Sequence, residues 1–203
     1  MIEAATAVFM KNGYEGTSME QIAAKAVVSK QTVYKHFADK EQLFSDIVLA
    51  TTEQVDRVVA LVAGTLNDTQ ALKKDLTVLS RQLIAALMDP QLLRLRRLVI
   101  ANAERMPELG RTWYAQGFER VLTTLASCFS GLAKRRLLYL EDPLLAAHHF
   151  VGLLLWIPVN QAMFTGNEQP CTKAALERYA DAAVNTFLAA YGVKSTVGAK
   201  ARG

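Results

Sequence analysis

Residues 17–40, TSMEQIAAKAVVSKQTVYKHFADK, decide the fold of the N-terminal part of this 203-residue chain. They predict two short helices joined by a tight turn, the second of which begins after Ser29, a residue type that caps helices well. Val33 and Phe37 lie four residues apart, so both fall on the side of the second helix that packs inward. The pattern is typical of a helix-turn-helix that turns the opposite side of its second helix outward.

The whole chain predicts an all-α protein of about nine helices. Proline and glycine are few, and no segment alternates apolar and polar residues as half-buried strands do. Gly13 ends the first helix, and Asp39 caps a fourth helix that we expect to continue to about Ala63. Asp or Thr residues precede most of the later helices, which we expect over 67–88, 89–105, 106–138, 142–166 and 172–190. We expect a DNA-binding domain over 1–47, a larger helical domain over 48–191 and a disordered tail over 192–203.

The composition is that of a globular protein, with 51% hydrophobic and 21% charged residues. Cys128 and Cys171 are far apart and have no metal-binding or redox spacing, so we expect reduced thiols in the cytoplasm. No basic segment followed by an apolar run stands at the N-terminus, so we expect no secretion signal. No cofactor-binding motif is found, and we expect no cofactor.

Residues 143–166, PLLAAHHFVGLLLWIPVNQAMFTG, contain no Asp, Glu, Lys or Arg. By length and charge alone this segment could span a bilayer. Two histidines, an asparagine, a glutamine and Pro158 within it argue against a membrane span. We expect instead a helix buried on most of its sides, in a core or against another subunit.

The outward side of the second motif helix carries side chains that can read DNA. Lysine can donate to guanine, glutamine can pair with adenine, and threonine can touch a thymine methyl group. On this basis we expect base contacts from Lys30, Gln31, Thr32 and Tyr34. His36 and Lys40 lie further along, where side chains meet the phosphate backbone, and Thr17 can bind a phosphate at the opposite end of the unit.

Charge favours DNA binding only locally. The net charge is +4 and the isoelectric point is near 9.1, yet residues 1–50 hold five lysines and six carboxylates. Lysines gather around the second motif helix, at Lys25, Lys30, Lys35 and Lys40. Two alternatives stay open, because Lys25 could serve only to solvate its helix and His36 could be a packed core histidine.

The runs AATAVFMKNGYEGTSMEQIAAKA (4–26) and VSKQTVYKHFADKEQLF (28–44) strongly resemble the N-terminal domain of the TetR/AcrR family of transcriptional regulators. A weaker resemblance, to the ligand-binding and dimerisation half of the AefR-like branch, is carried by residues 93–122 and 142–164. The resemblance implies an all-helical homodimer in which the first three helices bind DNA and the last two pair with those of the second subunit. By position it also assigns phosphate contacts to Thr17, Lys35, His36 and Lys40.

Two features depart from the family pattern. Members usually have glycine where this chain has Val27, in the turn between the motif helices. A left-handed valine there would cost roughly 1–2 kcal/mol, so either the turn opens differently or the domain is slightly strained. Members also usually carry a basic segment before the first helix, whereas this sequence starts inside that helix.

The larger half offers candidates for an apolar ligand pocket with a few polar contacts. Plain core packing is the alternative for each aromatic residue. His148 and His149 are adjacent and point in different directions, so we expect no metal site. The arginines Arg94, Arg96 and Arg97 are expected to form a solvated helix face. The ligand candidates are Asn102, Trp113, Phe118, Leu122, His149, Phe150, Trp156, Asn160 and Met163.

The uncharged helix and the last helix are suited to a subunit interface, because small residues allow close approach and apolar residues recur at three and four spacing. Burial in the core of the same chain is the alternative. The interface candidates are Leu144, Val151, Gly152, Leu155, Val159, Tyr179, Ala183 and Phe187.

These patterns together predict a ligand-responsive transcriptional regulator, most simply a repressor. It would bind a palindromic double-stranded DNA operator as a homodimer and be released by a small apolar effector. A constitutive DNA-binding protein without an effector is one alternative. An enzyme or small-molecule carrier that uses the helical half is the other, although we find no nucleophile–base pair, carboxylate pair or phosphate loop.

Overall fold

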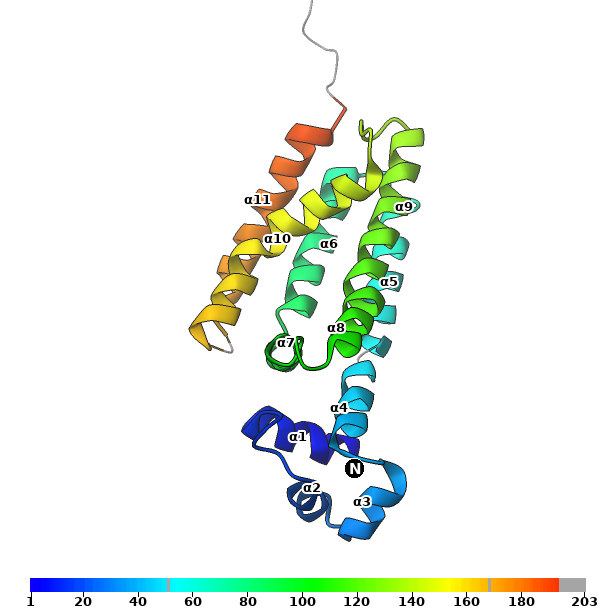
Figure 1. Ribbon diagram of the computed structural model, residues 1–203. Helices are drawn as coiled ribbons and strands as arrows, with labels where there is room; N and C mark the ends of the chain where they lie inside the picture. The colour runs from blue at the N-terminus through cyan, green and yellow to red at the C-terminus, as the bar shows by residue number, and fades with distance from the viewer. Residues whose placement is uncertain (51, 168, 194–203) are drawn as a thin grey trace, which may run out of the picture. The chain divides into compact units, whose positions relative to one another are not determined.

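The computed structural model describes residues 1–50, 52–167 and 169–193, and all of their regular secondary structure is helical (Figure 1). The chain divides into two compact units. Unit 1 comprises residues 1–57, 87–120 and 161–170, and unit 2 comprises residues 58–86, 121–160 and 171 onward. The expected tail lies outside the described residues from position 194 on. Residues 87–120 thus associate with the N-terminal helices, although we expected them in a separate domain.

Unit 1 begins with the helices α1 (Ile2–Asn12), α2 (Met19–Ala26), α3 (Lys30–His36) and α4 (Lys40–Leu49). Local sequence signals explain their ends. Gly13 ends α1 with a positive φ of 72°. Ser18 and Gln21 form a reciprocal capping box at the start of α2, and Asp39 caps α4 by accepting from the backbone N–H of Gln42 at 2.8 Å.

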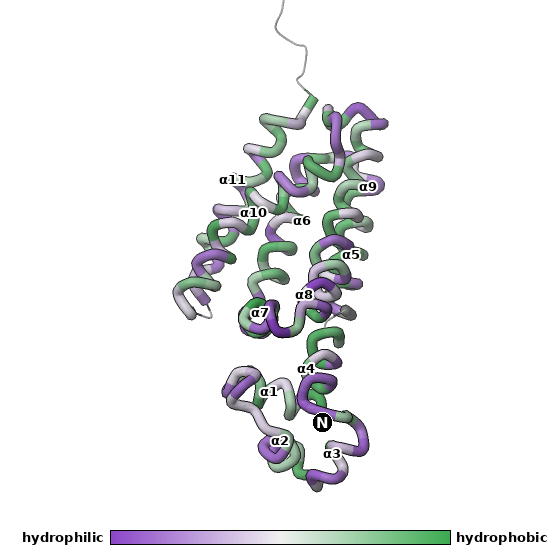
Figure 2. The backbone as a smooth tube through the Cα atoms, viewed as in Figure 1, coloured by the Kyte–Doolittle hydropathy of each residue, from purple (hydrophilic) through white to green (hydrophobic). Residues whose placement is uncertain are grey.

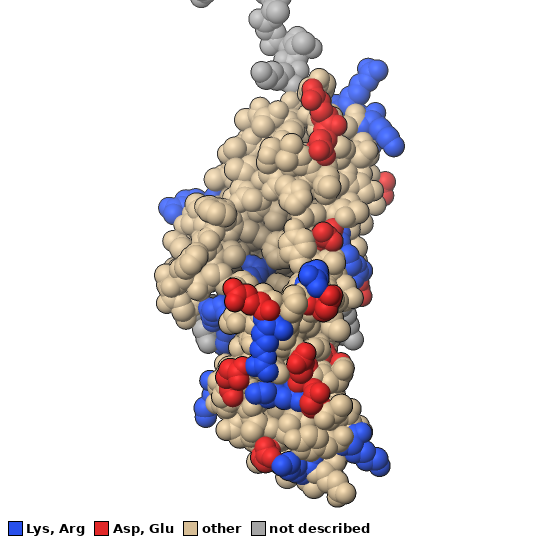
Figure 3. Space-filling view, in the orientation of Figure 1, with Lys and Arg blue, Asp and Glu red and all other residues tan. Residues whose placement is uncertain are grey.

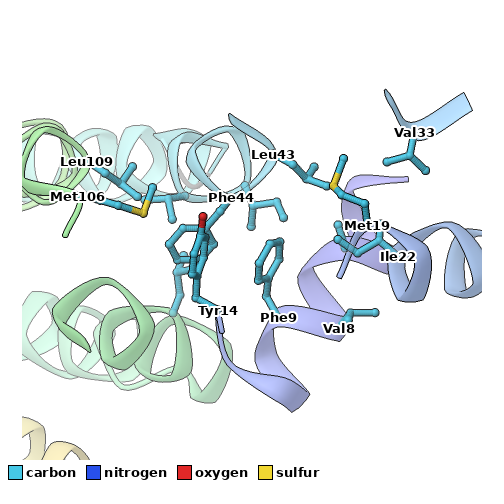
Figure 4. Close-up of a cluster of buried hydrophobic side chains, with 14 of the residues drawn as sticks. Val8, Phe9, Tyr14, Met19, Ile22, Val33, Leu43, Phe44, Met106 and Leu109 are labelled. Carbon is cyan, nitrogen blue, oxygen red and sulfur yellow. The ribbon is translucent and has the colours of Figure 1, made fainter. Parts of the chain in front are cut away.

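The remaining elements of unit 1 are α7 (Pro90–Ala101), α8 (Pro107–Tyr114) and a π-helical segment, η1 (Ala115–Glu119). One hydrophobic cluster joins them to the N-terminal helices. Phe9, Tyr14 and Phe44 pack ring against ring, with centroids 5.1–5.9 Å apart, and Met106 and Leu109 lie beside them (Figure 4). The N-terminal helices therefore share their core with α7 and α8.

Unit 2 contains most of α5 (Thr52–Leu66) and α10 (Pro143–Thr165), with α6 (Leu72–Leu87), α9 (Arg120–Lys134) and α11 (Lys173–Tyr191). Its centre is an aromatic cluster of Phe129, Phe150 and Phe187, one from each of α9, α10 and α11, with ring centroids 5.0–5.7 Å apart. Arg81 of α6 makes a two-point hydrogen-bonded ion pair with Asp181 of α11.

Two of the long helices expected from the sequence are each divided in the structure. The helix expected from Asp39 to Ala63 consists of α4 and α5, and it passes Gly64 to end at Leu66. The helix expected over 106–138 consists of α8, η1 and α9. A π turn changes hydrogen-bond register without requiring glycine or proline, so the apolar periodicity gave no sign of it.

Among the described residues, α10 is a helix long and apolar enough to cross a membrane by length and composition, and 33% of its most apolar window is buried. The core helix of a globular protein passes the same test. Hydropathy along the backbone shows apolar residues throughout this helix, mixed with few polar ones (Figure 2).

Candidate nucleic-acid interface

Helix α3 is held from beneath by one fully buried side chain, Val33, with Phe37 half-buried against the same cluster. Ser29 caps its N-terminus by accepting from the backbone N–H of Thr32 at 3.0 Å. The Ser29 hydroxyl also lies 2.8 Å from the Thr32 hydroxyl. A seven-residue helix is too short to be stable alone, so this packing and this cap fix its orientation.

The side of α3 opposite Val33 is open. Gln31, Lys35 and His36 are exposed, and Tyr34 keeps 43% of its surface accessible. The exposure of His36 removes the alternative that it is a packed core histidine, and Lys25 of α2 is exposed as well. The residues expected to reach base edges therefore stand on an accessible helix face, as a reader of the major groove requires.

Lys30 is paired within the chain. Its ammonium forms an ion pair with Glu20 of α2 and lies 5.7 Å from the centroid of the Tyr34 ring. The hydrogen-bonded pair lowers the pKa of the Glu20 carboxyl and raises the pKa of the Lys30 ammonium. Both side chains are more than half exposed, so the pair is open to competition from a phosphate or a base. This contact was not predicted from the sequence, because it joins residues ten positions apart on separate helices.

Thr17 and Lys40 are engaged inside unit 1. Thr17 is buried, and its hydroxyl donates to the carbonyl of Gly13 at 2.7 Å. The Lys40 ammonium donates to the carbonyls of Tyr14 and Thr17 at 2.9 and 3.0 Å and lies 4.4 Å from the centroid of the Tyr14 ring. Both side chains stabilise the turn between α1 and α2. The phosphate contacts that we expected at these two positions stay predictions.

The turn between α2 and α3 contains a left-handed valine. Val27 has φ 56° and ψ 43° and is 90% exposed. The backbone N–H groups of Val27 and Val28 donate to the carbonyls of Ala24 and Ala23, which is the Schellman pattern of helix ends. Of the two alternatives that the sequence left open, the structure has the strained one. The turn keeps the geometry that glycine would adopt.

The nine candidate ligand residues fall in both units. Unit 1 holds Asn102, Trp113, Phe118 and Met163, all of them half-buried, and Asn102 donates through its side chain to the carbonyl of Leu98 at 2.8 Å. In unit 2, Leu122 and Phe150 are fully packed core residues. Trp156 is 73% exposed on the surface, which contradicts its assignment to a pocket.

The other two polar candidates have partners within unit 2. The side chain of Asn160 donates to the carbonyl of Trp156 at 2.7 Å, and Nδ1 of His149 lies 2.5 Å from the Tyr191 hydroxyl. A shallow hollow in unit 2 is lined by residues of a single stretch, Ala71–Arg81, none of which was a ligand candidate. Within the described ranges, no group of three or more His, Cys, Asp or Glu could hold a metal ion.

The interface candidates divide by exposure. Leu144 and Gly152 are exposed, and Val159 and Tyr179 are half-buried. The other four are core residues of unit 2, which corrects their assignment to an interface: Val151, Leu155, Ala183 and Phe187. The exposed side of α10 also carries Leu153, Trp156 and Ile157 at three and four spacing, with Leu145 eight positions before Leu153. Figure 3 shows few charged side chains over α10 and α11.

The arginines of α7 are not the solvated face that we expected. Arg96 is 5% exposed, and Arg94 and Arg97 are half-buried. Arg97 donates to the carbonyl of Ala162 at 3.0 Å. Three arginines within four positions cannot share one helix face, so at least one of them had to turn toward the protein.

A short polar bridge links α7 and α8 to the motif. Arg105, in the loop between α7 and α8, forms an ion pair with Glu15, and its guanidinium carbon lies 4.7 Å from the centroid of the Tyr14 ring. The Lys40 ammonium is a second cation beside that ring. Burial raises the pKa of the Tyr14 hydroxyl. The sequence pattern did not single out Tyr14 or Arg105, because their contact joins residues 91 positions apart.

Helix α3 follows a tight turn, packs one side into the core and exposes the other. This arrangement places the chain in the class of helix-turn-helix DNA-binding proteins. Residues 1–47 match the family described as bacterial regulatory proteins, tetR family, and residues 74–193 match the AefR-like transcriptional repressor C-terminal domain. The chain belongs to the TetR family of transcriptional regulators.

Solved structures give the same result along the whole chain. A TetR-family transcriptional regulator from Mesorhizobium loti is 57% identical, with 95% of each chain covered and a TM-score of 0.88. The flavonoid-responsive regulator FrrA is 28% identical, with 96% of each chain covered and a TM-score of 0.74.

Among curated relatives, the HTH-type transcriptional regulator YhgD of Bacillus subtilis is 45% identical over 47 residues, which are 23% of this chain and 25% of YhgD. The HTH-type transcriptional activator FasR of Mycolicibacterium smegmatis is 35% identical over 69 residues, 34% of this chain and 30% of FasR. The chain thus spans only about a quarter to a third of the length of these curated relatives.

Proposed function

We propose that this TetR-family protein is a ligand-responsive repressor that binds a near-palindromic operator as a homodimer in the cytoplasm. One observation carries the proposal. The side of α3 that bears Gln31 and Tyr34 is exposed, while the opposite side is locked into a core that continues through α7 and α8. A base-reading surface is thereby attached to a separate part of the fold through packed side chains.

At the DNA, each exposed residue of α3 has a defined task. Gln31 would pair with an adenine, and Lys30 would donate to a guanine or a phosphate after leaving Glu20. Tyr34 and the methyl group of Thr32 would contact bases from the same face. Lys35 and His36, one turn further on, would meet phosphates. Backbone N–H groups at the start of α4 would supply an anion site near Lys40, whose own ammonium braces the α1–α2 turn.

The exposed face of α10 supports the proposed homodimer. Four large apolar side chains on one face of a helix form a patch that monomeric proteins rarely leave open to water. A second copy of the chain would cover it by twofold pairing. Such a dimer would set two copies of α3 in successive major grooves, about 34–36 Å apart.

An effector would act through unit 1. Trp113 and Leu98 pack against the cluster that holds Phe9, Tyr14 and Phe44. Arg105 adds a polar contact to Tyr14, which in turn touches Lys40 at the start of α4. A ligand would displace the protein from DNA if it bound more tightly to an arrangement of α7 and α8 in which α3 cannot dock on DNA. The change in DNA affinity cannot exceed the difference between the ligand affinities of the two arrangements. FrrA is named for its response to flavonoids, and this relative supports a small aromatic molecule as the class of effector.

The alternatives differ in what they require. A constitutive DNA-binding protein would bind the operator equally with and without small molecules. An enzyme or carrier would bind a small molecule without affecting DNA. The sign of regulation is a separate matter, because FasR is a transcriptional activator.

The decisive experiment is a footprint of the purified protein on the DNA upstream of its own gene, at low and moderate salt. We expect protection of an inverted repeat. Gln31→Ala should weaken binding by about 1–3 kcal/mol and relax the preference for one base pair in each half-site. Gln82→Ala, a change at an exposed glutamine of α6, is the matched control and should bind as the wild type does. No protection of any repeat at low salt would rule out the operator.

A further inference from the structure

Arg96 of α7 is the most unusual side chain of unit 1. It is 5% exposed, and its Nε is buried without a hydrogen-bond partner. Within the described part of the chain, its recorded contacts are with two aromatic rings and with no carboxylate, carbonyl or hydroxyl group. Buried arginines are ordinarily paired, because an uncompensated buried cation opposes folding. Desolvation alone lowers the pKa of its guanidinium to about 10, so the group stays charged at neutral pH.

The aromatic neighbours lie close to the guanidinium, whereas its Nε–H is buried without an acceptor among the described residues. The guanidinium carbon lies 5.0 Å from the centroid of the Phe118 ring and 5.9 Å from that of Trp113. Aromatic faces attract a cation, but the five N–H donors of arginine point outward in the plane of the group. The acceptor that matches this planar fork is a carboxylate, which can bind it through two parallel hydrogen bonds.

The backbone beside Arg96 is also unusual. Phe118 belongs to the π-helical segment η1, which interrupts the line of α8 and α9. Its ring stacks on that of Tyr114 with centroids 5.9 Å apart and planes at 9°. Single π turns inside helices recur at functional sites, where the altered register re-aims side chains. This observation is independent of the missing acceptor and concerns the same ring.

We propose that Arg96 is the anchor of the effector site and that the effector is a small carboxylate with an apolar or aromatic body. Its carboxylate would bind the N–H edge of Arg96, and its body would lie against the side chains of Trp113 and Phe118. This inference rests on the proposed effector response and adds the chemical class of the ligand. Trp113 also packs on the core cluster of the DNA-binding helices, so a ligand beside Trp113 would contact a side chain that supports the helices around α3.

Calorimetric titration of the full chain with two matched pairs of probes tests this assignment. The pairs are 2-naphthoate with 2-naphthamide and decanoate with decanamide, which differ in charge and hardly in shape. We expect at least one carboxylate to bind ten times more tightly than its amide. Arg96→Met should abolish that preference and leave the affinity for the amide unchanged, while Arg96→Lys should keep part of it. Arg111→Met, at an exposed arginine of α8, is the control and should behave as the wild type.

A second readout separates ligand recognition from a structural role. Because Arg96 has no hydrogen-bond acceptor among the described residues, Arg96→Met should unfold at the same temperature as the wild type or higher. An arginine that held the fold together would give a lower unfolding temperature when replaced. A large fall, with the charge preference retained in the folded fraction, would overturn the assignment.

Other outcomes are equally decisive. Preference for the amides, equal binding of carboxylates by Arg96→Met, or no binding of either carboxylate up to its solubility limit would each overturn the proposal. The operator experiment is separate, since it needs no ligand. Operator binding without carboxylate binding would support the proposed regulator and overturn the carboxylate site. Carboxylate binding through Arg96 without operator binding would support the carboxylate site and overturn the proposed regulator.

Discussion

Helices α3 and α10 both present an exposed face, and the two faces have opposite chemistry. Helix α3 has seven residues, one fully buried side chain and an outer face of lysine, glutamine and tyrosine. Helix α10 has twenty-three residues and an outer face on which Leu153, Trp156 and Ile157 stand open to water. A polar face is hydrated and stays exposed without cost in the absence of DNA. An apolar face of this kind is unfavourable in water and is ordinarily covered. This difference in chemistry is why we propose DNA as the partner of α3 and a second copy of the chain as the partner of α10.

Trp156→Glu, which places a charge on the exposed face of α10, should have the largest effect. We expect the dimer to dissociate, because a desolvated carboxylate opposes association. Without simultaneous use of both half-sites, operator affinity should fall by about 10²–10⁴-fold. Light scattering and gel shift measure the two effects, with Gln82→Glu on α6 as the control for added charge. A variant that remains dimeric would show that α10 is not the interface.

Phe150→Ala and Trp156→Ala change the two opposite sides of α10. Phe150 is fully buried between Phe129 and Phe187, so its truncation leaves a cavity and should lower the free energy of unfolding by about 3–5 kcal/mol. Trp156→Ala should chiefly weaken dimerisation, so its effect on unfolding should depend on protein concentration. Urea denaturation at several concentrations distinguishes them. Equal losses that do not vary with concentration would contradict the assignment of Trp156 to the surface.

Val27→Gly tests the strain in the turn that positions α3. Glycine adopts the left-handed conformation without the clash that valine suffers, so we expect a gain of about 1 kcal/mol in the free energy of unfolding. Arg136, left-handed at the end of α9 with φ 59°, provides the matched control, and Arg136→Gly should stabilise by a smaller amount because arginine is not β-branched. Thermal denaturation of both variants measures the difference. A loss of stability in Val27→Gly would mean that the valine side chain makes a contact worth more than the strain.

The smallest expected effect is that of Glu20→Gln, which releases Lys30 on the outer face of α3. One more unpaired lysine per subunit should strengthen DNA binding slightly and steepen its dependence on salt, with the logarithmic slope changing by about 1 per subunit. The wild type should gain the same release only in acid, since the pair lowers the pKa of Glu20 below its ordinary value and acid must protonate it. Salt titration of operator binding at neutral pH measures the effect, and an unchanged slope would show that Lys30 does not reach a phosphate.

Most of the DNA-binding region could be predicted because its signals are local. Ser18, Ser29 and Asp39 each cap a helix within three residues of their own position, and Val33 and Phe37 mark the inner side of α3 by spacing alone. The family resemblance and the all-α fold followed from the same stretch. The internal role of Lys40 could not be predicted, because its hydrogen bonds cross 23 and 26 positions of sequence.

The larger half was harder for a different reason. Residues 143–165 are apolar almost all round, so periodicity does not say which side of that helix faces its own core, and Val151 and Leu155 were placed on the wrong side. The π segment around Phe118 leaves no mark in the sequence, since it is a change of hydrogen-bond register.

The amino-acid sequence by itself determined the helices of the motif, their caps and the residues offered to DNA, because capping and helical spacing act over a few positions. Only the tertiary structure decided that Arg96 lies buried close to two rings and that Trp156 stands exposed. Burial depends on what other segments cover, and those segments are brought together by packing between parts of the chain far apart in sequence.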